Sequence, residues 1–111
     1  MSRFFRSPAG LALGAALALA GAIGPAFALP ADPAHGEQLA RRWCVACHIV
    51  AADQTRGSDN VPSFPSIAKH PGFSADAVAR FLMDPHPKMP DMQLTRDESR
   101  DLGAYIASLA R

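Results

Sequence analysis

The chain has 111 residues, 49% of them hydrophobic, and a formal net charge of +1 at neutral pH. This length suits one small domain, and the charges form no run of the kind that binds nucleic acid. We therefore expect a single small domain whose partners do not include nucleic acids.

Residues 1–28 have the pattern of a cleaved secretory signal peptide. Arg3 and Arg6 precede an apolar run at residues 11–23, and the small-x-small pattern Ala26-Phe27-Ala28 follows. An uncleaved membrane anchor is the alternative, but the run is rich in alanine and glycine and falls short of the ~20 strongly apolar residues that a span needs. We expect cleavage after Ala28, export to the periplasm and no stable membrane insertion afterwards.

The mature domain, residues 29–111, is small and nearly neutral. Removing 28 of the 111 residues leaves 83, and with Arg3 and Arg6 gone nine basic side chains face ten acidic ones, a net charge of −1. A domain of this size buries only ~60% of the surface of its unfolded chain, or a little more, and commonly needs reinforcement by a covalent or metal-based group.

The first predicted helix covers residues 33–43. Asp32 is its expected N-cap, and Pro33 takes the first helical position, where proline is well tolerated. The helix leads directly into the sequence CVACH, residues 44–48, which holds both cysteines of the chain. This segment is therefore the first candidate for chemistry.

Three possible roles of the two cysteines, a disulfide, a redox pair and a zinc site, fit the sequence poorly. A disulfide between Cys44 and Cys47 would close a tiny loop and remove little entropy from the unfolded chain. A thioredoxin-like redox pair expects a strand before the motif and a helix after it, which is the reverse of the predicted order. A zinc site would need more ligands, and the remaining histidines are isolated in the sequence: His35, His70 and His86.

Covalent haem attachment is the reading that uses every reactive side chain of CVACH. The thiols of Cys44 and Cys47 would add to the two haem vinyl groups, and the imidazole of His48 would bind the iron. The haem would also supply the large apolar surface that so short a chain lacks. We therefore expect one covalent haem c, with a redox or metal-binding cysteine pair as the alternative.

The segment after the motif is predicted to be irregular from residue 49 to 68, with Phe64 and Ile67 packing on the haem. A second helix should begin at the N-cap Ser74 and stop at Asp84, before a proline. Its face of Val78, Phe81 and Leu82 belongs to the core.

The next segment holds three prolines, at positions 85, 87 and 90, which predict a stiff extended loop around Met89. The last helix opens with a capping box formed by Thr95 and Glu98. Its apolar stripe, which packs against the rest of the domain, consists of Leu94, Leu102, Tyr105, Ile106 and Leu109.

Most of the mature chain resembles the small class I cytochromes c of bacteria. The resemblance rests on CVACH, VPSF and HPKMPDMQLTRDESRDLGAYIASL, in the order of the family. It implies an all-α fold of three to four helices around one haem, with the N- and C-terminal helices crossing where Gly36 and Ala40 meet Leu102 and Tyr105. Gly103 departs from the pattern, and inside a helix glycine costs ~1 kcal/mol relative to alanine.

The resemblance also implies the ligands of the iron. His48 would be the proximal ligand, with its other ring N–H donating to the carbonyl of Pro62, and Met89 would be the distal ligand. A role for Met89 as a flexible core residue stays open, as does His86 as the sixth ligand. Met83 and Met92 would then be core or haem-wall residues.

A histidine and a methionine together fill both axial positions, which suits electron transfer and leaves no site for a substrate. We therefore expect a monomeric, non-enzymatic, soluble periplasmic carrier. It would move electrons between redox partner proteins, from a dehydrogenase or quinol-oxidising complex to a terminal oxidase or reductase. The alternatives are a haem subunit of a larger redox enzyme and an open-site haem protein that binds ligands or catalyses a reaction.

Overall fold

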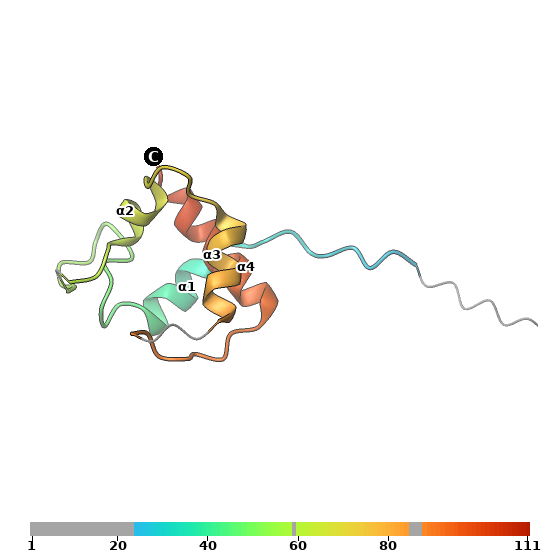
Figure 1. Cartoon of the computed structure of the whole chain (residues 1–111), viewed down its shortest axis with the longest axis horizontal. Helices are drawn as coiled ribbons and strands as arrows, with labels where there is room; N and C mark the ends of the chain where they lie inside the picture. The colour runs from blue at the N-terminus through green and yellow to red at the C-terminus, as the bar shows by residue number, and fades with distance from the viewer. Residues whose placement is uncertain (1–23, 59, 85–87) are drawn as a thin grey trace, which may run out of the picture.

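The structure is a computed structural model, and it describes residues 24–58, 60–84 and 88–111 (Figure 1). Most of the expected signal peptide, residues 1–28, lies outside these residues; residues 24–28 are extended, exposed and directed away from the helices. The described residues form four helices and no strand: α1 (Pro33–Trp43), α2 (Phe64–Ala68), α3 (Ala75–Met83) and α4 (Arg96–Ser108). The predicted all-α class is confirmed.

No helix in the described part of the chain combines the length and the apolar character that crossing a bilayer requires.

Local signals determine where the three longer helices begin. The carboxylate of Asp32 accepts hydrogen bonds from the N–H groups of Ala34 and His35 at the start of α1. Ser74 caps α3, and at α4 both arms of the capping box between Thr95 and Glu98 are formed. Each cap satisfies N–H groups that have no partner inside the helix, so these starts were predictable.

Helix α2 corrects the expectation of an irregular segment over residues 49–68. Its first turn is capped by the hydroxyl of Ser63, which accepts from the N–H of Ser66, and Pro65 lies within that turn. A five-residue helix shows no apolar period, so the pattern could not reveal it. The helix places Phe64 and Ala68 in the core.

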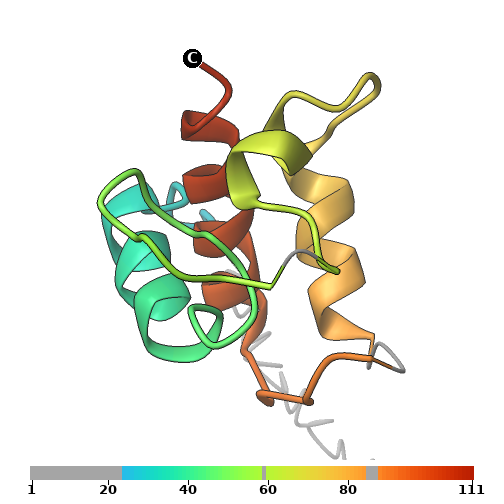
Figure 2. The same cartoon turned by 90° about the vertical axis from the view of Figure 1, so that its left-hand side faces the viewer.

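Helix α4 is the centre of the domain and packs against α1, α2 and α3. Figure 2 shows α1 and α3 on either side of it. The crossing of the terminal helices is confirmed and is very close at Gly36, because a Cβ atom there would lie 2.1 Å from the carbonyl oxygen of Asp101 and 2.9 Å from the Cβ of Tyr105.

Gly103 makes a second close contact, on the side of α4 that faces α3. A Cβ atom at this position would lie 2.5 Å from the carbonyl oxygen of Ala75, the first residue of α3. The glycine is therefore explained by the approach of α3 and does not loosen the crossing with α1. Glycine lowers the helix propensity of α4, but its lack of a side chain lets α3 pack closely on the side of α4 opposite α1.

A partly buried ion pair reinforces the crossing. Nδ1 of His35 lies 2.7 Å from one carboxylate oxygen of Asp101, and the other oxygen accepts the N–H of Asp32 at 2.7 Å. The hydrogen bond to Asp101 raises the pKa of His35. Burial opposes ionisation of Asp101, but the hydrogen bonds from His35 and Asp32 outweigh it, and the net pKa of the carboxyl is lowered.

We predict that this pair makes stability depend on pH. Its contribution is fully present below the ordinary histidine pKa of 6.5 and is lost as pH rises through the raised pKa of the folded state. Asp101 remains ionised throughout this range because its pKa is lowered. His35→Gln should therefore lower the melting temperature more at about pH 6 than at about pH 9. His70→Gln is the control, since His70 has no ion pair among the described residues; an equal loss at both pH values would contradict the assignment.

Candidate functional site

An apolar cavity lies between the end of α1, α2, α3 and α4. The motif CVACH contributes two of its lining residues, Cys44 and His48, and the loop after α3 contributes Met89. The residues that line the cavity are Cys44, His48, Phe64, Ile67, Val78, Phe81, Leu82, Met89, Leu102 and Ile106. The fold thus brings together residues from five separate segments of the chain.

His48 is held on two sides. Its Nδ1 atom lies 2.6 Å from the carbonyl oxygen of Pro62, and its ring centroid is 5.3 Å from that of Phe64, with the planes tilted by 51°. With the ring proton on Nδ1, this atom donates to Pro62 and leaves Nε2 available as a metal ligand. The imidazole is buried, and His48 lines the apolar cavity.

The two cysteines follow directly from the end of α1. Both thiols are free; Cys44 is buried in the cavity wall, whereas Cys47 is exposed. The N–H of His48 and the N–H of Cys47 both donate to the carbonyl of Cys44, which makes the motif a tight turn. Burial raises the pKa of Cys44 to about 11, and this disfavours a redox pair, whose attacking thiol needs a lowered pKa.

Met89 and Met92 lie in different places. Met89 is half-buried and lines the apolar cavity together with His48. Met92 does not line that cavity but a small neighbouring one, which Met89 also lines. Residues 85–87 lie outside the described residues, so His86 and the first part of the proline-rich loop are not placed.

Other residues singled out in the sequence have separate positions. Phe64 and Ile67 line the cavity, as haem-packing residues would. Trp43, the residue just before Cys44, does not line the cavity; the residue is 46% exposed, and its ring lies under the guanidinium of Arg42, whose Cζ is 4.7 Å from the ring centroid. Met83 lies in a second cavity between α3 and α4, where its sulfur accepts the hydroxyl of Ser99 at 3.2 Å.

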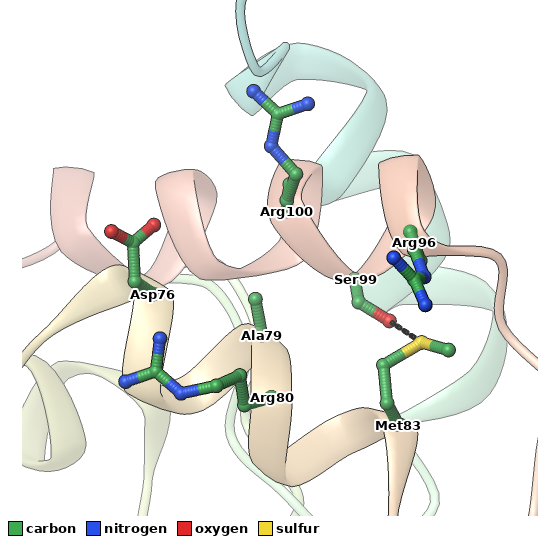
Figure 3. A pocket seen from close by; sticks show the side chains of 7 residues that line it. All are labelled: Asp76, Ala79, Arg80, Met83, Arg96, Ser99 and Arg100. Atoms are coloured by element: carbon green, nitrogen blue, oxygen red, sulfur yellow. Dashed lines mark hydrogen bonds between the residues drawn. The ribbon is translucent and has the colours of Figure 1, made fainter. Parts of the chain in front are cut away.

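That second cavity shares no residue with the first. Figure 3 shows its lining, in which three arginines extend in different directions around an apolar floor. Arg100 is directed away from the other two and bonds to Asp97 and to the carbonyl of Leu29. Because the cations do not converge, this cavity lacks the geometry of a site for a single anion.

Two side chains near the motif escaped sequence reasoning. The carboxamide of Gln54 hydrogen-bonds to main-chain groups around His48, and the hydroxyl of Tyr105 donates to the carbonyl of Val50 at 2.6 Å. A glutamine in a loop carries no recognisable signal. Tyr105 was placed on the packing face of its helix, but nothing in the pattern identified its hydrogen-bond partner.

The donor set fits a haem with thioether links. The cavity is apolar, and its lining includes the thiol-bearing Cys44, the imidazole-bearing His48 and the thioether-bearing Met89, while Cys47 follows Cys44 in the same turn. A bare metal ion fits poorly, because the described residues contain no group of three or more His, Cys, Asp or Glu side chains placed to hold one.

Comparison with known proteins agrees with this chemistry. A protein-family model described as cytochrome c oxidase, cbb3-type, subunit III matches residues 31–106. The chain is also 52% identical over 96 residues to cytochrome c-552 of Bradyrhizobium diazoefficiens, an alignment that covers 86% of this chain and 92% of the relative. The chain belongs to the cytochrome c family. No solved structure matches the cytochrome significantly.

Membership in the cytochrome c family confirms two predictions, the class of the protein and its cofactor. The cytochrome is a small bacterial class I cytochrome c, and the family carries covalently bound haem c, for which this chain has two cysteines. The relationship also supports a role in carrying electrons. The individual ligands, the compartment and the partners stay predictions.

Proposed function

We propose that the cytochrome is a periplasmic one-electron carrier whose haem is attached to Cys44 and Cys47 and ligated by His48 and Met89. The observation that carries the proposal is that His48 and Met89 line the same apolar cavity as Cys44. The bound haem supplies the one-electron redox chemistry. The carbonyl of Pro62 holds the proton on Nδ1 of His48 and so keeps Nε2 oriented and basic.

A carrier function, and not catalysis, follows from this ligand set. If His48 and Met89 both bind the iron, no coordination site would be left for oxygen or a substrate. The aromatic and aliphatic walls of the cavity would keep water away from the bound haem and so limit the solvent rearrangement that accompanies a change of charge. Its partners would be a dehydrogenase or quinol-oxidising complex and a terminal oxidase or reductase, which the monomer would visit in turn.

Visible spectroscopy tests this proposal. The oxidised protein should show the charge-transfer band of sulfur bound to ferric iron, and carbon monoxide should leave the spectrum of the reduced protein unchanged. A spectrum that changes at once on adding carbon monoxide would instead support an open-site haem protein.

We predict that the mature protein begins at Leu29 and carries one covalent haem. The main chain meets the folded domain at this residue, because the guanidinium of Arg100 donates to the carbonyl of Leu29 at 3.1 Å. Residues 24–28 are exposed and extended. The intact mass of protein exported by its host should equal that of residues 29–111 plus one haem. A mass equal to that of the bare chain, or haem that dissolves in acidic acetone, would refute the prediction.

A dedicated subunit of a larger oxidase is the second candidate function. The description of the matching family, cytochrome c oxidase, cbb3-type, subunit III, favours it. The haem chemistry is the same in both cases, so the two differ only in association. A subunit would purify with the other chains of the enzyme at moderate salt, whereas a carrier would purify alone.

We predict that a free carrier reacts with its partners at rates that depend little on salt. The mature chain has a net charge near zero, so long-range steering should be modest. Stopped-flow rates with a purified oxidase should fall by less than roughly tenfold between low and physiological ionic strength. A steeper fall would reveal a charged docking surface.

A further inference from the structure

The side chain of Gln54 connects the haem-attachment motif to the loop that follows it. Its Nε2 atom donates to the carbonyls of His48 and Arg56, both at 2.6 Å, and lies 3.3 Å from the carbonyl of Val45. Its Oε1 atom accepts the N–H of Val50 at 2.9 Å. One carboxamide thus contacts the main chain before, at and after His48.

A turn brings the carboxamide to this position. The N–H of Gln54 donates to the carbonyl of Ala51 at 3.1 Å, which reverses the chain just after the motif. The same loop makes one more contact, from the N–H of Ser58 to the carbonyl of Cys47 at 2.9 Å. The carbonyls of Val45, Cys47 and His48 are therefore bonded to the loop, and among these contacts Gln54 contributes a side chain whereas Ser58 contributes its main-chain N–H.

Val50 gives this arrangement a rigid support. Its side chain is fully buried, its N–H is bonded to Gln54, and its carbonyl accepts the hydroxyl of Tyr105 at 2.6 Å. Tyr105 belongs to α4, the central helix of the domain. Val50 thus connects the side chain of Gln54 to α4 through two hydrogen bonds.

Two independent anchors then define the orientation of His48. Pro62 holds the ring at Nδ1, and Gln54 holds the main chain at the carbonyl. If only the ring nitrogen were anchored, the imidazole could still change its orientation when the main chain of His48 shifts. With the main chain anchored as well, the orientation of the ring is restricted. A carboxamide suits this task because it donates and accepts at the same position; glutamate would keep only the acceptor and methionine neither group.

We propose that Gln54 is a positioning residue for His48, which fixes the plane of the imidazole at the iron. The inference rests on the proposed role of His48 as the proximal ligand. It assigns a function in tuning the haem to a residue that touches neither the iron nor the cavity. A loop residue with only a structural role would affect stability and leave the electronic state of the haem unchanged.

The test compares three variants of the purified holoprotein: Gln54→Met, Gln54→Glu and the control Gln38→Met. Gln38 is exposed on α1, and its side chain has no hydrogen-bond partner among the described residues. One readout is the set of paramagnetic shifts of the haem methyl groups in the ferric protein, which depend on the plane of the axial imidazole. The others are the reduction potential and the hydrogen exchange of the Val50 amide.

Gln54→Met should displace the haem methyl shifts and the reduction potential and should speed exchange at Val50 by roughly tenfold. Gln54→Glu should displace the same shifts and the potential but keep Val50 protected, because it retains the acceptor and loses the donors to His48. Gln38→Met should match the wild type. If Gln54→Met does not fold, the glutamate variant decides alone.

Haem methyl shifts and a potential unchanged in Gln54→Glu would overturn the proposal, even if the melting temperature falls. Failure of the proposed ligation would look different, because the wild type itself would then lack the spectrum of a histidine- and methionine-ligated haem.

Discussion

Met89→Ala should abolish the sulfur-to-iron charge-transfer band, lower the reduction potential and allow reduced protein to bind carbon monoxide. Soft thioether sulfur stabilises ferrous iron more than ferric iron, so its loss favours the oxidised state. The shift should be a sizeable part of the ~0.8 V range over which axial ligands set haem potentials. Visible spectra and a redox titration of the purified variant would measure all three effects.

Met92→Leu is the matched control. Met92 is three residues further along the same loop but lines only the small neighbouring cavity, so its loss should leave the band and the potential close to those of the wild type. If Met92→Leu loses the band while Met89→Ala keeps it, the ligand assignment is wrong. If both variants keep it, the sulfur of another methionine is the ligand. If the wild type itself lacks the band, His86, which lies outside the described residues, becomes the candidate.

Gly36→Ala should destabilise the cytochrome strongly despite the better helix propensity of alanine. The added carbon would lie 2.1 Å from the carbonyl oxygen of Asp101, where ~3.5 Å or more is needed for contact between non-bonded heavy atoms. The obstacle is main chain, so a rotamer change cannot relieve it, and α1 and α4 must separate. Overpacking of this kind costs ~1–3 kcal/mol or more, which exceeds the ~1 kcal/mol gained in propensity.

Thermal unfolding of the holoprotein would measure the effect, with an expected fall in melting temperature of roughly 10 °C for a loss of ~2 kcal/mol. Gln38→Ala, on the exposed face of the same helix, should stay within about 0.5 kcal/mol of the wild type. A Gly36→Ala variant with a higher melting temperature would show that propensity outweighs contact and that the two helices have room to adjust.

The chemistry of this cytochrome was predictable because its signals are short and local. The motif at residues 44–48 holds three reactive side chains within five positions, and caps such as Asp32 and Thr95 act on N–H groups two or three residues away. Such patterns depend on neighbours in the chain. They could therefore indicate haem attachment and three of the four helices before any contact between distant segments was known.

The resemblance to class I cytochromes c supplied the next level of prediction. It named Pro62 as the acceptor for His48 and placed Gly36 at the helix crossing. In the structure Nδ1 of His48 lies 2.6 Å from the carbonyl oxygen of Pro62, and Gly36 contacts α4. These contacts join residues far apart in the sequence, so a related fold was needed to foresee them.

The sequence by itself determined the haem motif, the methionine in its proline-rich loop and the start of each long helix, since these depend on a few adjacent residues. Only the tertiary structure decided that Met89 shares a cavity with His48 while Met92 does not, and that Gly103 faces α3. It alone placed the carboxamide of Gln54 against the main chain of His48. Each of these depends on how separate segments pack in three dimensions, which no local pattern encodes.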